Sequence, residues 1–173
     1  VIAAVEGPVA NLEATRAGHF IYSQHLPLPP GRYTLETAVL DRETMKVSGS
    51  KKSLIVPAAP AGVGISALAL VRNVNATNGP VEDAEDPLQF EGGKVTISLD
   101  DTVKSGAGNK LSLYFNVYPQ EGVAEAAKLV LGFLQGGKAV VRGEPELPKA
   151  DATGRIAYIA AVPTDSLKPG QYE

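Results

Sequence analysis

The stretch Leu28–Asp41 has the sequence LPPGRYTLETAVLD, a proline–glycine turn followed by an alternating segment. Tyr33, Leu35 and Val39 alternate with more polar residues, which is the period of two that a half-buried β-strand requires. The turn returns in residues 167–173, whose sequence is LKPGQYE. The first stretch predicts a strand that starts at a turn, and its return predicts an internal repeat.

Alternation of period two recurs in the segments KLSLYFNVYP (110–119) and KVTISLD (94–100). The apolar residues on one face are Leu111, Leu113, Phe115 and Val117 in the first segment and Val95, Ile97 and Leu99 in the second. Gly136-Gly137 joins two apolar runs and predicts a hairpin, because its tight turn needs positive φ. Eighteen glycines and thirteen prolines interrupt the runs at strand-length intervals. We therefore expect an all-β fold, an immunoglobulin- or fibronectin-like β-sandwich.

The composition indicates a folded domain and excludes several kinds of site. The 173 residues are 44% hydrophobic, enough for a core, and the apolar runs are far shorter than the ~20 residues of a membrane-spanning helix. A net charge of -3 without a basic tract argues against a nucleic-acid partner. The absence of cysteine excludes disulfides, thiolate metal sites and cysteine nucleophiles. The chain opens with VIAAVEG, and we expect an internal or processed piece of a longer precursor.

A boundary is predicted in IVPAAPAGVG (55–64), where proline and alanine are dense and a new strand begins. We place a first segment at 1–57, the C-terminal strands of one sandwich, and a second sandwich at 58–173. The acidity lies in the second segment, which has fourteen Asp and Glu against ten Lys and Arg. The stretch EGVAEAAK (121–128) predicts at most one or two turns of helix.

The repeat extends beyond the turn motif. VEGPVANLEATRAGHFIY (5–22) aligns with VRGEPELPKADATGRIAY (141–158), and the two turn motifs align after three extra residues in the second copy. The aligned pairs are Gly7 with Gly143, Gly18 with Gly154, Tyr22 with Tyr158, Gly31 with Gly170 and Tyr33 with Tyr172. The first copy continues into a strand, a turn at DRETMK and a closing strand, and the second copy lacks this hairpin. We therefore expect the end of one sandwich and most of the next.

A sandwich without its last hairpin would expose strand edges and an apolar face, unless another chain covers them. We predict that a second copy supplies the strands by β-strand addition, in which main-chain hydrogen bonds give affinity. Repeated head to tail, this contact builds a filament. The predicted partner is thus the chain itself, or neighbouring domains of the same chain, with no membrane insertion.

Several segments resemble the C-terminal β-rich regions of acidobacterial von Willebrand factor type A-related (VWFA-related) proteins. The segments are LPLPPGRYTLETAVLDRETMKV, ISALALVRNV, DPLQF, LSLYFNVYP and LKPGQYE. The resemblance implies a secreted or cell-surface protein whose sandwich-like repeats follow a von Willebrand type A domain, without known enzymatic activity. That domain and its D-x-S-x-S adhesion site are absent from this sequence, so the resemblance brings no metal site to these residues.

The two turn motifs contain the residues for which we predict a structural role: Pro30, Gly31, Tyr33, Pro169, Gly170 and Tyr172. The prolines fix the turn. Each tyrosine is expected to pack its ring under a corner and to donate its hydroxyl to nearby backbone.

No pattern of catalytic or metal-binding residues stands out. The only histidines, His19 and His25, are predicted to be surface residues. The acidic residues Glu82, Asp83, Glu85 and Asp86 lack the D-x-D-x-D-G form of a calcium loop, so we expect a solvated loop. GGKVTIS (92–98) lacks the spacing of a phosphate-binding loop and is interpreted as part of a hairpin. We therefore expect neither a cofactor nor a metal.

Two further features concern the surface. NAT (75–77) fits the glycosylation pattern and is expected in an exposed loop, which makes Asn75 a possible acceptor. Tyr114 and Tyr118 share the face opposite Phe115, where they would line either a second packed surface or an interface with another subunit.

The main prediction is a non-enzymatic, extracellular structural module that assembles into a filament by strand exchange. The alternative is an adhesion or binding accessory module, which a self-sufficient sandwich would favour. A third class, a hydrolase, would need a buried histidine–carboxylate pair near a nucleophile.

Overall fold

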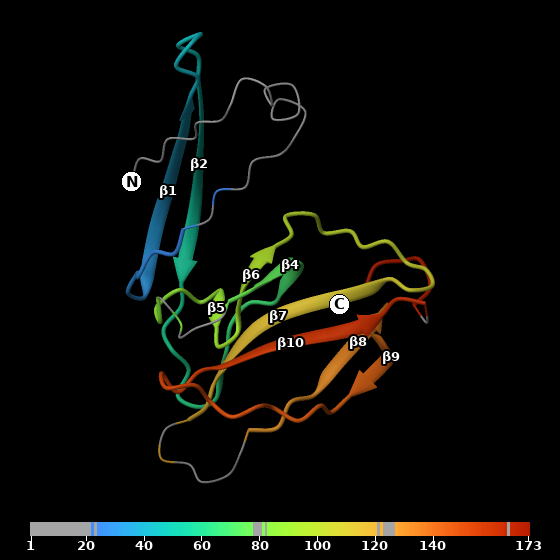
Figure 1. Cartoon of the computed structure of the whole chain (residues 1–173). Helices are drawn as coiled ribbons and strands as arrows, with labels where there is room; N and C mark the ends of the chain where they lie inside the picture. The colour runs from blue at the N-terminus through green and yellow to red at the C-terminus, as the bar shows by residue number, and fades with distance from the viewer. Residues whose placement is uncertain are drawn as a thin grey trace.

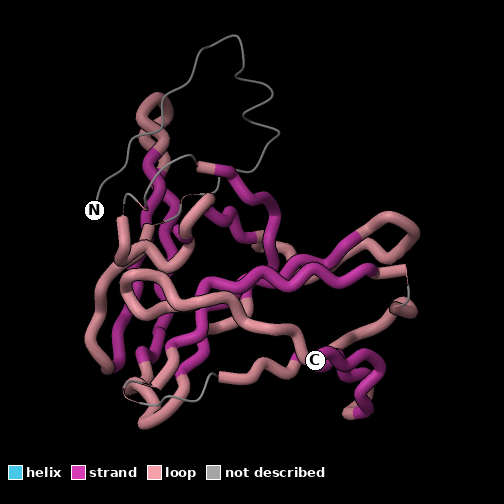
Figure 2. Tube along the Cα trace, turned by 60° about the horizontal axis from the view of Figure 1, so that its bottom comes forward, coloured by secondary structure: helices cyan, strands magenta, loops and turns pink. Residues whose placement is uncertain are grey.

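The computed structural model contains ten β-strands and no helix among the residues that it describes (Figures 1 and 2). The described residues are 22, 24–77, 81, 83–120, 122, 127–165 and 167–173. All strand pairings are antiparallel, and because the described part of the chain has strands and no helix, the prediction of an all-β fold is confirmed there. Most of the stretch 121–128, for which we expected a short helix, lies outside the described residues. A helix long and apolar enough to cross a bilayer is not found in the described part of the chain.

The main sheet has six strands in the order β10-β7-β4-β6-β5, and β3 pairs with the end of β7. Its strands are β3 (Gly64–Ile65), β4 (Ala69–Ala76), β5 (Gln89–Phe90), β6 (Gly93–Ile97), β7 (Lys110–Tyr118) and β10 (Ile156–Pro163). Strand β6 is shorter than its alternating pattern predicts. Leu99 lies beyond its end and is 73% exposed, so the expectation that Leu99 faces the core is wrong.

A second, two-stranded sheet consists of β8 (Leu131–Gln135) and β9 (Lys138–Gly143). Gly136 and Gly137 form the turn between them, with φ of 58° and 74°. Residues with a side chain rarely adopt positive φ, and two in succession would be strained, which explains the glycine pair. The predicted hairpin is confirmed.

The core lies between these two sheets and gives the body a sandwich-like form. Phe115 and Val117 on β7 are buried, and Ile156 on β10 and Leu129 just before β8 pack against them. The rings of Phe115 and Tyr158 lie 5.5 Å apart. The face of β7 that the alternation assigned to the core is therefore confirmed at its C-terminal half.

The opposite face of β7 is buried as well. Tyr114 is 2% and Asn116 1% exposed, and the Tyr114 hydroxyl and the Asn116 amide both donate to the carbonyl of Pro87, at 2.7 and 2.9 Å. Of the two alternatives for this face, Tyr114 therefore lines a second packed surface. Tyr118, 44% exposed, does not share that burial.

The strands β1 (Gly31–Leu40) and β2 (Val47–Val56) form a separate two-stranded sheet. In Figure 1 this hairpin stands away from the body of the molecule. Its connecting turn is ordered by the carboxylate of Asp41, which accepts hydrogen bonds from the backbone of Glu43 and Thr44 and from the Thr44 hydroxyl. The strands of the hairpin thus pair only with each other, and the buried core residues come from the two sheets of the body.

Candidate functional site

The β1–β2 hairpin is the most exposed apolar element of the described chain. Every side chain from residue 34 to residue 53 is exposed. The large apolar side chains concerned, with Ile55 next to them, are Leu35 (42%), Val39 (72%), Leu40 (49%), Met45 (70%), Val47 (67%) and Ile55 (64%). Since a lone two-stranded hairpin is at best marginally stable in water, this element gains stability when another surface covers it.

The hairpin has two different faces. Residues that pair directly across the strands point to the same side, so Tyr33 and Leu54 share one face with Leu35 and Val39. The other face carries the ion pair between Lys51 and Glu36, whose nearest atoms lie 2.7 Å apart. The exposed Leu40, Val47 and Ile55 lie on this second face, and Lys52 lies on the first, so both faces of the hairpin carry apolar and charged side chains.

The two turn motifs have the same local geometry. The hydroxyl of Tyr33 donates to the carbonyl of Pro29 at 2.7 Å, and that of Tyr172 donates to the carbonyl of Lys168 at 2.6 Å. In each case the acceptor lies four residues before the tyrosine. The repeat in the sequence is thus also a repeat in structure at these two corners.

The second corner lies against the edge of β8. The backbone N–H of Leu134 donates to the carbonyl of Glu173 at 2.9 Å, and the N–H of Glu173 donates back at 3.0 Å. A Cβ at Gly170 would meet the amide nitrogen at the end of the Gln135 side chain, so the corner and this flexible side chain lie in close contact. Glu173 therefore extends the β8–β9 sheet on the side away from β9.

A buried polar network ties the start of β10 to the loop before β5. Arg155 is 5% exposed and donates to the carbonyls of Asp86 (3.1 Å) and Gln89 (2.7 Å). Its Nε also lies 3.3 Å from the carboxylate of Asp151, and Lys94 Nζ lies 2.7 Å from the carboxylate of Asp86. Each charged group in the network has a partner of opposite charge, as burial requires.

The network shifts the pKa of both carboxylates. Burial alone would raise the pKa of Asp86, but the hydrogen bonds from Lys94 and from the N–H of Leu88 leave it below its ordinary value of 3.8. The pKa of Asp151 is likewise lowered against its burial, by the hydroxyl and N–H of Thr153 and the N–H of Arg155. Burial raises the pKa of Tyr114.

His25 lies beside a carboxylate, but not in a buried site. Its Nε2 is 3.4 Å from Asp83 Oδ2, and the two side chains are 31% and 46% exposed. The other oxygen of Asp83 accepts from the N–H of Glu85, which makes it part of a local turn. The buried pair that a hydrolase would need is therefore not formed here. His19 and Glu82 lie outside the described residues, and among the others no group of three or more His, Asp or Glu could hold a metal.

Asn75 is exposed but does not lie in a loop. It belongs to β4, opposite Lys94 on β6, and its amide group contacts Asn73 (2.8 Å) and the hydroxyl of Thr96 (3.4 Å). The expectation of a loop position is wrong, because the strand continues through the NAT triplet as far as Ala76.

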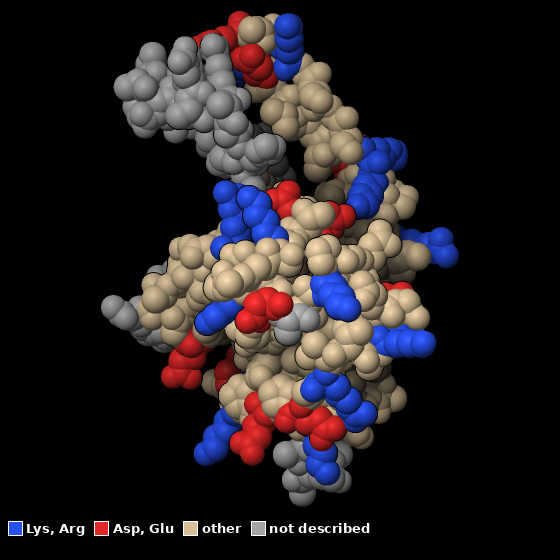
Figure 3. Space-filling view, turned by 90° about the vertical axis from the view of Figure 1, so that its right-hand side faces the viewer, with Lys and Arg blue, Asp and Glu red and all other residues tan. Residues whose placement is uncertain are grey.

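The other surface features are less distinctive. An open hollow of about 660 Å³ is lined by residues 57–62, 64, 65 and 118–120, and its walls are mainly proline and alanine. Figure 3 shows Lys and Arg interspersed with Asp and Glu over one face, so charge alone marks no site on that face.

Comparisons with protein-family models, with curated proteins and with solved structures found no match. The resemblance to VWFA-related proteins therefore remains a prediction, and any functional argument depends on the geometry above.

Sequence reasoning missed the network around Arg155, and the expectation of a solvated loop is wrong for Asp86, which is 5% exposed. One local signal was present, in DATGR (151–155). Asp151 accepts from the N–H and hydroxyl of Thr153, and Gly154 has φ of 79°, which together form an Asx turn. This pattern predicts the turn that positions Arg155, but it does not reveal the distant carbonyls that the guanidinium contacts.

Proposed function

We propose that this chain is a non-enzymatic, extracellular structural module with an immunoglobulin-like sandwich, and that copies of it associate by β-strand addition into a filament. The observation that carries the proposal is the β1–β2 hairpin, whose side chains from residue 34 to residue 53 are all exposed. The resemblance to secreted VWFA-related proteins supports the extracellular location.

The energetic gain from covering the hairpin is large enough for association. Burial of one Leu- or Val-sized side chain contributes about 1.5–3 kcal/mol, and Leu35, Val39 and Tyr33 lie on one face. Each main-chain hydrogen bond to a partner strand adds about 0.5–1.5 kcal/mol. Association costs about 4–15 kcal/mol, so a strand of six residues with two or three covered side chains reaches the required range.

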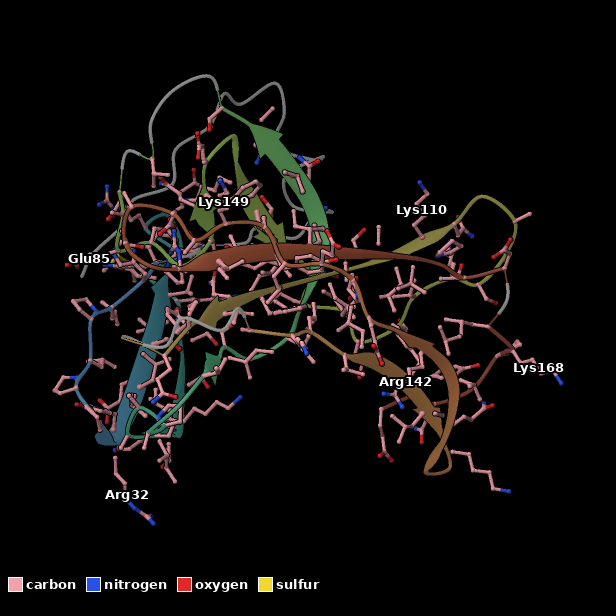
Figure 4. The ribbon with its side chains drawn as sticks, turned by 90° about the horizontal axis from the view of Figure 1, so that it is seen from below. Arg32, Glu85, Lys110, Arg142, Lys149 and Lys168 are labelled. Carbon is pink, nitrogen blue, oxygen red and sulfur yellow. The ribbon has the colours of Figure 1, made fainter. Side chains whose placement is uncertain are left out.

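The position of the hairpin favours an open assembly over a closed dimer. The hairpin and the β8–β9 sheet lie at opposite ends of the molecule in Figure 1. In Figure 4, Arg32 at the start of β1 is likewise far from Arg142 and Lys168. If the hairpin of one copy contacts the β8–β9 sheet of another, two different surfaces are joined, and the contact is heterologous. Repetition of a heterologous contact leads to a ring or a filament.

The test combines negative-stain electron microscopy with light scattering on the same sample. We expect filaments or oligomers for the wild-type chain, and monomers for the double variant Leu35→Lys/Val39→Lys. Leu99→Lys is the matched control, because Leu99 is also exposed but lies in the body. Monodisperse wild-type monomers at high concentration would refute the proposal and favour an accessory module.

A further inference from the structure

We propose that Met45, in the turn of the β1–β2 hairpin, is an oxidation site, and that its conversion to the sulfoxide by hydrogen peroxide separates the hairpin from a second copy of the chain. This inference rests on the proposed function, and it names a chemical modification that controls the proposed contact.

Met45 carries the only sulfur atom of the chain, which has one methionine and no cysteine. Its side chain is 70% exposed. It lies between the end of β1 and the start of β2, and in Figure 1 this end of the hairpin is far from the body. A dissolved oxidant therefore reaches the thioether directly, and no thiol of the same chain competes for it.

The backbone conformation of Met45 does not favour a methionine. Its φ is 54°, and it is the only residue other than glycine with a positive φ in the described part of the chain. A side chain disfavours this left-handed region, in which glycine or asparagine is more stable. The turn itself is held by other groups, since the N–H of Asp41 donates to the carbonyl of Lys46 at 2.9 Å and the Asp41 carboxylate accepts from Thr44. The exposed side chain of Met45 therefore serves a contact outside the hairpin and not the turn.

Met45 belongs to an exposed apolar end of the hairpin. Leu40 and Val47 pair directly across the strands and are 49% and 67% exposed. The charged residues of the turn carry both signs, so they make this end neither strongly acidic nor strongly basic. A second copy that covers this end removes all three apolar side chains from water. The flexible, polarizable side chain of methionine adapts to surfaces of different shape.

The reaction transfers one oxygen atom to the side chain. A lone pair of the Met45 sulfur attacks an oxygen of hydrogen peroxide, so that the S–O bond forms and the O–O bond breaks. The sulfur loses two electrons, and the peroxide gains them. The departing hydroxide takes the proton that remains on the transferred oxygen and leaves as water. The product is methionine sulfoxide, which is polar where the thioether was apolar.

The sulfoxide opposes the contact in two ways. Its oxygen is a hydrogen-bond acceptor, and burial of such a group without a partner is unfavourable. The apolar surface that the thioether added to the contact is also lost. Because a factor of ten corresponds to only about 1.4 kcal/mol, we expect the dissociation constant to rise at least about tenfold. Conversely, a second copy that covers Met45 shields the sulfur, so association should slow the oxidation.

Mild oxidation of the whole chain with hydrogen peroxide tests this inference. Mass spectrometry measures the gain of one oxygen atom, and light scattering over a dilution series measures association before and after the reaction. The matched control is the double variant Met45→Leu/Leu99→Met, which moves the thioether to the body, at a residue that is 73% exposed. The single variant Met45→Leu shows whether peroxide acts through any other residue. Circular dichroism verifies that each variant is folded.

We expect the oxidised wild-type chain to dissociate at a concentration at least about tenfold higher than the reduced chain, and methionine sulfoxide reductases to restore its association. The double variant should gain the same mass but associate equally before and after peroxide. Equal association of the reduced and oxidised wild type, or an equal loss in the wild type and the double variant, would overturn this inference and leave the proposed function standing. Wild-type monomers before any peroxide is added would overturn both.

Discussion

Replacement of Arg155 by methionine is the most informative single change in the body of this protein. Methionine keeps much of the volume of the side chain but removes the guanidinium. The carbonyls of Asp86 and Gln89 then lose a charged donor, and the carboxylate of Asp151 loses its ion pair. These acceptors come from positions 66 to 69 residues away from Arg155, or from its own turn.

The expected loss of stability is about 3 kcal/mol. Removal of one partner from a buried ion pair costs about 3–5 kcal/mol. The lower end applies here for two reasons. The side chain of Asp151 is 20% exposed, so water partly replaces the guanidinium, and Asp86 O still accepts from the N–H of Gln89. Since small domains have about 5–15 kcal/mol of stability in total, the variant should fold but unfold at markedly lower denaturant.

Urea unfolding followed by far-UV circular dichroism measures this change. With a slope of about 2 kcal/mol per molar urea, 3 kcal/mol corresponds to a midpoint lower by about 1.5 M. Arg142→Met is the matched control, because Arg142 and Glu144 form an ion pair whose side chains are 66% and 65% exposed. Such exposed pairs contribute about 0–1 kcal/mol. If the two arginine variants unfold at the same urea concentration, the reasoning about burial is refuted.

Three further changes test other parts of the structure. Phe115→Ala, at a fully buried position, should cost about 3–5 kcal/mol in urea unfolding, and a loss below about 1 kcal/mol would contradict the assigned core. Asp86 and Asp151 have lowered pKa values, so the folded state binds their protons more weakly than the unfolded chain. Their contribution is present above about pH 4 and is lost as the pH falls further, so the urea midpoint should decrease there; a constant midpoint would exclude this coupling. Tyr172→Phe should cost the body about 0.5–1.5 kcal/mol, whereas Tyr33→Phe should leave the unfolding of the body unchanged, and equal effects would show that the hairpin and the body unfold together.

The strands that depend on local alternation and turn chemistry could be predicted from the sequence. The period of two predicts that Phe115 and Val117 are buried, and the glycine pair at 136–137 predicts a hairpin turn; both predictions are confirmed. Both features depend only on residues that are close together in the sequence. The same rule failed at Leu99, because a pattern does not show where a strand leaves its sheet.

The long-range features could not be predicted. Nothing near Asn116 indicates that this polar residue is 1% exposed, because the carbonyl that satisfies it belongs to Pro87, 29 residues away. Arg155 shows the same limit, since a charged residue is normally exposed and only its distant acceptors explain its burial. The exposure of the hairpin was equally hidden, because its alternation is that of a strand with a buried face.

The separation between the hairpin and the body has a consequence for amide hydrogen exchange. Since the side chains of residues 34–53 are all exposed, the amides of β1 and β2 should open and exchange without the rest of the molecule. The body, held by Phe115 and by the network around Arg155, should exchange only on larger unfolding. When a second chain covers the arm, protection of β1 should rise with protein concentration while that of β7 stays constant. The protection of each β1 amide then measures the fraction of chains whose hairpin is covered by a second copy.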